Sequence, residues 1–266
     1  MERRAFLAAS GAAALGGASH GEAGGGAAGS APAGVRVLEL RRYRLRSGAL
    51  AARFAAYAKD ALVPALVRAG LSPVGAWNVA MGPESPTVHL LIPHPDAASV
   101  VTLAGRLLAD GEYARAAAST LVLPPGEPPY LACDVSLHAS VPTLPGVEVP
   151  TGALAGKDRL FELRTYRSAT EAAHLRKVEM FEAGGELALF RRVGLTPVFF
   201  GRDLAGSALP SLTYMVVFAD AAAREKAWAT FREHPEWVKM RDDLRYADTV
   251  SSIDASLLRP AEYSQV

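Results

Sequence analysis

Two stretches of the chain place an acid, a guanidinium and a phenol at alternate positions. The first stretch holds Glu39, Arg41 and Tyr43, and the second holds Glu162, Arg164 and Tyr166. Arginine offers a planar pair of donors, so each row could hold a ligand carboxylate or polarise a carbonyl. The same groups could instead form ion pairs that fix the register of a sheet. All six residues are therefore ligand-binding candidates, and both interpretations stay open.

These rows fall in predicted β-strands, where successive side chains point to opposite faces. Leu38 and Leu40 share one face of the first strand, and Phe161 and Leu163 share the matching face of the second. Apolar faces of a sheet usually pack under its helices. We therefore expect these apolar faces to lie under helices and the Glu–Arg–Tyr rows to face the space between the two halves of the chain.

A histidine and a tyrosine on later predicted strands could transfer protons. His89 lies in the predicted strand 87–92 and Tyr214 in the predicted strand 211–218. If these strands neighbour the first ones, both side chains line the same interior as the Glu–Arg–Tyr rows. Histidine titrates near neutrality and a phenol can donate a proton, so both residues are candidates for ligand binding and weak candidates for catalysis. A hydrogen-bonded interior histidine without a catalytic role is the alternative for His89.

Trp237 completes the set of ligand-binding candidates. It follows His234 and Pro235 inside a predicted helix, where proline breaks an interior turn. A new helix that starts there would aim Trp237 inward. The alternative is a tryptophan that anchors the core, with His234 as a helix cap.

The elements that would position these residues occur twice. Residues 37–44 and 69–74 return as residues 160–167 and 193–198 with closely similar sequences, which indicates a duplicated domain. Hydrophobic periodicity predicts strand, helix, two strands, helix and strand in each copy. The predicted ranges are 36–44, 50–67, 74–81, 87–92, 96–118 and 130–141, then 159–167, 170–192, 196–201, 211–218, 220–243 and 246–257.

This βαββαβ order is the ferredoxin-like arrangement, which leaves one sheet face bare. Two copies in one chain can cover each other's bare faces. The predicted fold class is therefore α+β, with two tandem ferredoxin-like units that form a dimeric α/β barrel within one chain. The predicted parts are an export signal and disordered tether (1–34), a first domain (35–141), a linker (142–157) and a second domain (158–260).

The N-terminus resembles a twin-arginine export signal. Arg3 and Arg4 precede Phe6, Leu7 and a run rich in alanine and glycine. Residues 19–34 are of low complexity and contain few large apolar groups. This pattern predicts a periplasmic protein whose signal covers about residues 1–33. A disordered tail with a chance pair of arginines is the alternative.

Charge and motifs limit the classes of function. The formal net charge of +1 provides no strong positive potential that would attract nucleic acid. No apolar run after the N-terminal segment is long enough to span a membrane. One cysteine, Cys133, excludes an internal disulfide. We find no local metal, dinucleotide or serine-hydrolase motif, so we expect no metal and no cofactor. A single histidine can ligate haem, so haem stays open.

Three motifs together resemble the NIPSNAP family, which belongs to the dimeric α/β barrel group. They are the Glu-Leu-Arg-x-Tyr strand, the Gly-Leu-[Ser/Thr]-Pro-Val turn (70–74 and 194–198) and the segment 231–237. The resemblance covers both halves and implies the barrel fold more specifically than it implies an activity. The first copy departs from it at Asp110–Tyr113, which stands opposite His234–Trp237. We therefore do not expect both halves to do the same task.

These observations favour an exported, NIPSNAP-like protein that binds a small, partly apolar ligand between its two repeats. One alternative is a cofactor-independent oxygenase or isomerase, with His89 or Tyr214 as the proton-transfer group. Another is a structural or interaction protein with a filled barrel. The sequence leaves open whether the chain is an enzyme and whether it forms a homo-oligomer.

Overall fold

The computed structural model describes residues 34–83, 85–122 and 127–266. The predicted export signal lies outside these ranges. The first half contains β1 (Val37–Arg44), α1 (Ala49–Tyr57), a π-helix η1 (Ala58–Leu62), α2 (Val63–Arg68), β2 (Gly75–Met81), β3 (Thr87–His94), α3 (Ala97–Ala109), α4 (Gly111–Leu121) and β4 (Ala132–Ser140). No helix in the described ranges is both long and apolar enough to cross a bilayer.

The second half repeats this order after a short 3-10 turn, η2 (Gly152–Ala155). It contains β5 (Leu160–Arg167), α5 (Glu171–Phe181), α6 (Glu186–Arg192), β6 (Thr196–Ala205), β7 (Ser211–Phe218), α7 (Ala221–Glu233), α8 (Pro235–Arg241), a 3-10 turn η3 (Leu244–Tyr246) and β8 (Ser252–Pro260). The last strand starts later than predicted, because Tyr246 belongs to η3 and not to β8.

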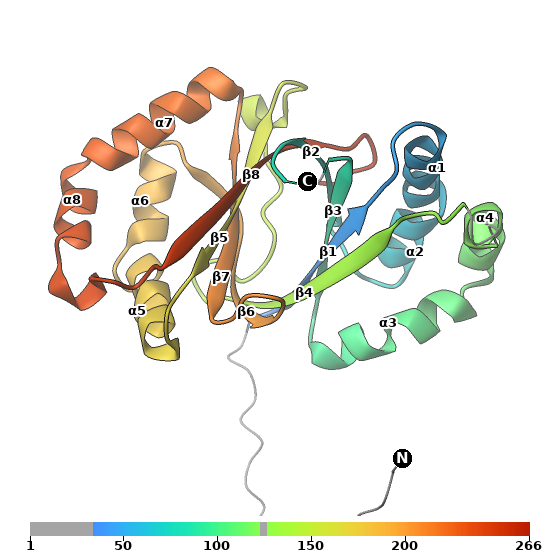
Figure 1. The fold of residues 1–266 in the computed structure, drawn as a ribbon, viewed down its shortest axis with the longest axis horizontal. Helices are drawn as coiled ribbons and strands as arrows, with labels where there is room; N and C mark the ends of the chain where they lie inside the picture. The colour runs from blue at the N-terminus through green and yellow to red at the C-terminus, as the bar shows by residue number, and fades with distance from the viewer. Residues whose placement is uncertain (1–33, 84, 123–126) are drawn as a thin grey trace, which may run out of the picture. The chain divides into compact units, whose positions relative to one another are not determined.

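The strands of both halves form one closed barrel. Their order is β1-β3-β2-β8-β5-β7-β6-β4, and every neighbouring pair is antiparallel. Pairing of β2 with β8 and of β4 with β6 joins the halves, so each half covers the sheet edges of the other. Helices α1–α4 lie on one side of the barrel and α5–α8 on the other (Figure 1). The prediction of two ferredoxin-like units in an intrachain barrel is confirmed.

Two long predicted helices are each divided by a residue that caps a new helix. Asp110 accepts hydrogen bonds from the backbone N–H groups of Glu112 and Tyr113 and starts α4. His234 Nδ1 accepts from the backbone N–H of Glu236, and Pro235 occupies the first turn of α8. Proline fits that position because its missing N–H has no partner there anyway.

The described residues bury three apolar clusters. One lies between the sheet and helices of the first half and contains Phe54 and Leu66. A second occupies the corresponding space of the second half and contains Phe181 and Phe190. The third fills the inside of the barrel, where residues from both halves meet; its members include Leu38, Leu40, Trp77, Leu91, Phe161, Leu163, Phe199 and Met215.

This arrangement corrects the expected orientation of the first strands. Leu38, Leu40, Phe161 and Leu163 point into the barrel, whereas the Glu–Arg–Tyr rows lie on the helix side. The alternation was predicted correctly, but the assignment of its two faces was wrong. Closure of the barrel buries both faces, so the apolar face packs against the other half and the polar row is neutralised under the helices.

Candidate functional site

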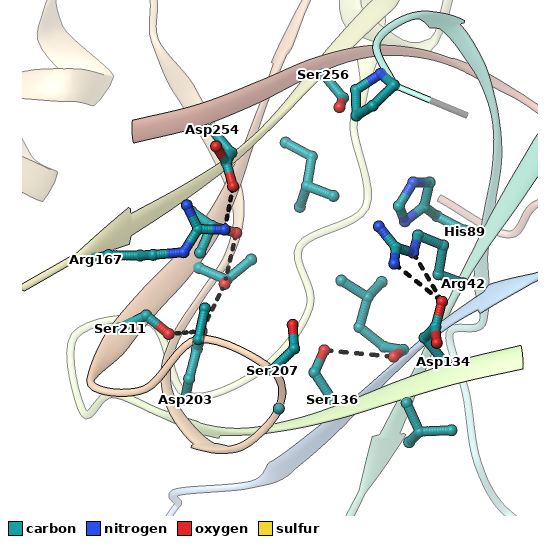
Figure 2. A pocket seen from close by; sticks show the side chains of 18 of the residues that line it. Arg42, His89, Asp134, Ser136, Arg167, Asp203, Ser207, Ser211, Asp254 and Ser256 are labelled. Carbon is teal, nitrogen blue, oxygen red and sulfur yellow. Dashed lines mark hydrogen bonds and ion pairs between the residues drawn. The ribbon is translucent and has the colours of Figure 1, made fainter. Parts of the chain in front are cut away.

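A cavity of about 860 Å³ occupies one end of the barrel. It lies where β1 and β5 end and where β3 and β7 begin, and the apolar cluster fills the opposite end. Apolar side chains such as Leu40 and Leu163 contribute to its wall. Its polar lining comes from both halves and includes Arg42, His89, Asp134, Ser136, Thr165, Arg167, Asp203, Ser211, Thr213 and Asp254 (Figure 2). Residues 34–83, 85–122 and 127–266 therefore leave one end of the barrel unfilled.

The first half contributes an ion pair and an imidazole to this cavity. Arg42 donates to Asp134 Oδ2 through Nη2 at 2.9 Å and through Nε at 3.3 Å. His89 lies opposite Arg42 in the pairing of β1 with β3, so the two side chains share the inner face. Figure 2 shows Arg42 and His89 projecting into the same cavity.

The second half contributes a different set at the matching positions. Thr165 and Thr213 are paired across β5 and β7 in the same way as Arg42 and His89, and their hydroxyls lie 3.0 Å apart. An ion pair joins Arg167 to Asp254. The cavity is therefore asymmetric at these matched positions, because the first half has an arginine and a histidine where the second half has two threonines.

His89 is buried and electrically neutral near pH 7. Its side chain is 7% exposed, and Nδ1 has no hydrogen-bond partner among the described residues. Burial lowers the pKa of His89 from 6.5 to about 4, and the positive charge of Arg42 acts in the same direction. The neutral imidazole has one ring nitrogen that can donate a hydrogen bond and one that can accept one.

We expect this pKa shift to make stability depend on pH. Because the folded pKa lies below the unfolded one, the unfolded chain takes up the proton first, and folding stability falls as the pH drops from 6.5 to about 4. The shift corresponds to roughly 3 kcal/mol. In the variant His89→Gln this part of the pH dependence should disappear, which urea unfolding at a series of pH values would measure. Equal pH dependence in both proteins would contradict the shift.

A polar cluster of three residues borders the same cavity. Ser136 Oγ lies 2.9 Å from His138 Nε2, and His138 Nδ1 lies 2.6 Å from Asp203 Oδ1. Ser136 and Asp203 line the cavity, whereas His138 is buried behind them with 1% exposure. No local sequence pattern indicates this cluster, because its members come from both halves and meet only after β4 pairs with β6.

The first Glu–Arg–Tyr row forms a closed network on the helix side. Glu39 accepts from Arg41 Nε at 2.7 Å and lies 2.9 Å from His94 Nε2, while Arg41 donates to the hydroxyl of Tyr43 at 3.2 Å. Burial alone would raise the pKa of Glu39, but the hydrogen bonds of His94 and Arg41 outweigh it and lower this pKa. None of the three row residues lines the barrel cavity.

The second row is held more firmly. Glu162 is fully buried and accepts from Arg164 at 2.6 Å, Arg224 at 2.7 Å and the indole N–H of Trp228 at 2.8 Å. Burial would raise the pKa of Glu162, but these three donors outweigh it and lower the pKa. Its carboxylate is thus occupied by protein donors.

Tyr214 also lies on the helix side, which corrects the expectation that it shares an interior with His89. Tyr214 pairs with Arg164 in the register, whereas the position that matches His89 is Thr213, one residue earlier. The Tyr214 hydroxyl donates to that of Tyr166 at 2.9 Å. Burial raises the pKa of Tyr214 well above its usual value. A proton-transfer role for Tyr214 in the barrel cavity is therefore wrong.

A smaller groove of about 310 Å³ lies on the helix side of the second half and is lined in part by Arg164, Tyr166 and Trp237. The guanidinium of Arg164 lies 4.8 Å from the ring centre of Trp228, a cation–π distance. Trp237 packs on Phe231, with ring centres 4.5 Å apart. The new helix start at Pro235 turns Trp237 toward Phe231, and His234 caps that helix, so Trp237 both anchors the core and lines the groove.

The predicted site residues therefore fall into three groups. His89 lines the barrel cavity, and Arg164, Tyr166 and Trp237 line the helix-side groove. The others, Glu39, Arg41, Tyr43, Glu162 and Tyr214, line neither. Within the described ranges, no group of three or more histidine, cysteine, aspartate or glutamate side chains could hold a metal ion.

The fold and the shared cavity define a dimeric α/β barrel whose two units are joined in one chain. The sequence profile of the NIPSNAP family matches residues 38–123 and 161–265, one segment in each half. The chain belongs to the NIPSNAP family. No curated protein sequence gives a match.

Solved structures with the same fold include two that span both halves. A candidate monooxygenase from Lactobacillus acidophilus has a TM-score of 0.55 and 10% identity, over 85% of this chain and 94% of its own. Another from Fusobacterium nucleatum has a TM-score of 0.52 and 10% identity, over 86% and 93%. A NIPSNAP-like domain protein from Burkholderia xenovorans is 19% identical, with a TM-score of 0.37, and covers 42% of this chain and 92% of its own. At 10% identity, the likeness to the first two structures shows a shared fold alone.

Proposed function

We propose that the protein binds a small, partly apolar ligand in the barrel cavity. The observation that carries the proposal is the buried imidazole of His89, which lines a cavity of about 860 Å³ built by both halves and whose Nδ1 has no hydrogen-bond partner among the described residues. Cavities of this size with a few convergent polar groups are typical of small-molecule sites.

The cavity lining indicates the chemistry of the ligand. Leu40, Leu163 and Val135 offer apolar contact, while Arg42 and Arg167 offer donors on opposite sides. Both arginines are already paired with aspartates, so the cavity carries no large excess of either charge. We infer a ligand with an apolar body and polar groups at its ends, bound without a cofactor.

Native mass spectrometry of the protein purified from its own host tests this proposal. We expect a co-purifying small molecule that is lost from Ser256→Phe, which fills the cavity, and retained by Trp237→Ala, which alters only the helix-side groove. The reverse pattern, or a wild-type chain that retains nothing, contradicts the proposal. An absorption spectrum with a Soret band would contradict a site without haem.

A cofactor-independent oxygenase or isomerase is the second candidate, favoured by the neutral imidazole of His89 in the cavity. A neutral histidine can accept a proton from a bound ligand, although its low pKa makes it a weak base. The barrels from Lactobacillus acidophilus and Fusobacterium nucleatum agree with this candidate only at the level of fold. With the retained molecule as substrate, His89→Ala should abolish turnover or oxygen uptake in a folded protein. Unchanged turnover would remove His89 from the site.

We also propose that the chain is exported through a twin-arginine pathway to the periplasm. The support is the sequence Arg3-Arg4-Ala-Phe-Leu at the N-terminus. Because this pathway reads the arginine pair, the double substitution Arg3→Lys and Arg4→Lys should move the protein from the periplasmic fraction to the cytoplasmic one. Immunoblots of the two fractions measure the change. An unchanged distribution would contradict export by this route.

A further inference from the structure

We propose that Ser136, His138 and Asp203 form a nucleophilic relay that cleaves an acyl ester bound in the barrel cavity. This inference rests on the proposed function only in that the ester must enter the same cavity. Its basis is the geometry of the three residues, their burial and their position at the cavity wall.

The distances match those of a nucleophile, a general base and an orienting acid. Ser136 Oγ lies 2.9 Å from His138 Nε2, and His138 Nδ1 lies 2.6 Å from Asp203 Oδ1. These spacings satisfy the geometric requirement for base-activated attack by a hydroxyl. The carbonyl oxygen of Leu40 lies farther from Ser136 Oγ, at 3.5 Å, so His138 is the closer acceptor.

Two further contacts hold the acid in place. Asp203 Oδ2 accepts from the hydroxyl of Ser211 at 2.6 Å and from that of Thr213 at 3.0 Å. Oδ1 is left to accept from His138 Nδ1–H, which sets the tautomer in which Nε2 is unprotonated. In that tautomer Nε2 of His138 can take the proton of Ser136, and Asp203 has the role of the acid that orients the histidine in a serine triad.

The backbone places the three groups with little freedom. Ser136 and His138 are two residues apart on β4 and share its inner face. The register of β4 with β6 shifts next to His138, and such bulges re-aim side chains beside functional sites. Gly201 permits the approach of β6, because a Cβ there would lie 2.6 Å from the Cβ of His138.

The matching positions of the other half lack this chemistry. The strand registers place Ser256 at the position equivalent to Ser136, Leu258 at that of His138 and Val79 at that of Asp203. Leu258 and Val79, both apolar, therefore occupy the positions that correspond to the base His138 and the acid Asp203. A hydroxyl alone at Ser256 serves as an internal comparison.

The reaction balances with water as the second reactant. Ser136 Oγ bonds to the acyl carbon while its proton passes to His138 Nε2, and the carbonyl oxygen takes up the electron pair. Collapse breaks the bond to the alcohol oxygen, which leaves with the proton from His138. Water then attacks the acyl-serine with His138 as base, and the carboxylic acid is released. Arg42, which is paired with Asp134, lies one row further along the inner face and offers guanidinium N–H donors to that side of the cavity.

The test uses the full chain, p-nitrophenyl butyrate as ester and a fluorophosphonate as covalent probe. We expect the probe to add to the peptide that contains Ser136 and not to the one that contains Ser256. Ester hydrolysis should fall about 100-fold or more in Ser136→Ala and in His138→Leu, which copies the other half. Thr102→Ala, which alters an exposed hydroxyl on α3, should leave it unchanged.

The outcomes separate this proposal from ligand binding. No adduct on Ser136, or hydrolysis by Ser136→Ala equal to that of the wild type, overturns the relay. If the wild-type protein still retains a small molecule in native mass spectrometry, only the relay is refuted. If it shows neither a Ser136-dependent reaction nor a retained molecule, the cavity is refuted as a site. Because burial of His138 could make His138→Leu unstable, Ser136→Ala with an unchanged melting temperature provides the deciding comparison.

Discussion

Replacement of Glu162 by alanine should lower the free energy of unfolding by about 3–5 kcal/mol. The carboxylate is fully buried and accepts from Arg164, Arg224 and the indole of Trp228. Its removal leaves these donors without their shared acceptor, and both guanidinium groups lie largely out of solvent. Urea unfolding of the wild type and of Glu162→Ala measures the difference.

An exposed ion pair provides the control for this substitution. Glu148 binds Arg191 through two contacts of 2.8 Å, but both side chains are more than two-fifths exposed. We expect Glu148→Ala to cost no more than about 1 kcal/mol. Because the folded pKa of Glu162 is lowered, its contribution is present above the unfolded pKa and is lost as the pH falls through the folded pKa. Equal losses for the two variants at neutral pH would contradict a special role for Glu162.

Replacement of Trp77 by alanine should cost about 3–5 kcal/mol, because it opens a void in the filled end of the barrel. Trp77 is completely buried, and its ring centre lies 5.4 Å from that of Phe161 in the other half. The indole also covers Gly75, where a Cβ would lie 2.0 Å from the ring. Thermal and urea unfolding measure the loss.

Two variants show whether this effect comes from the packing of the barrel interior. Trp77→Phe should cost much less than Trp77→Ala, because the indole N–H has no hydrogen-bond partner among the described residues and phenylalanine removes that buried donor. Trp237→Ala, at a partly buried tryptophan on α8, should cost about 1–2 kcal/mol. A larger loss for Trp237→Ala than for Trp77→Ala would contradict the assignment of the barrel interior as the joint core.

The fold was largely predictable because the duplication and the hydrophobic periodicity can both be recognised directly in the sequence. The repeated strand at residues 37–44 and 160–167 indicated the duplication, and hydrophobic periodicity predicted the βαββαβ order of each copy. Alternation also identified which residues share a face. It did not identify which face meets the helices, because a closed barrel buries both faces and leaves no solvent-exposed face to distinguish them.

The Glu–Arg–Tyr rows illustrate that limit. Charged residues in a strand usually indicate a polar surface, but Glu39 and Glu162 are buried under helices and neutralised by arginine. The partners that make this burial stable, His94 and Arg224, come from positions that only the folded chain brings near. The polar rows were therefore assigned to the wrong side of the sheet.

Ser136 and His138 left only a weak signal in the sequence. They alternate on one predicted strand, which indicates a shared face, but a serine and a histidine two residues apart are common by chance. The third member, Asp203, lies in the other half and reaches them through the pairing of β4 with β6. A site assembled across the duplication cannot be found by a search for local motifs.

A crystal structure of the protein purified from its own host provides the most direct test of the central claim, that the two halves bind a ligand between them at the open end of the barrel. We expect density for a small molecule between the wall of Arg42 and His89 and the wall of Arg167 and Asp254 (Figure 2). Density confined to the helix-side groove beside Trp237, or a barrel cavity that contains only water, would contradict the claim.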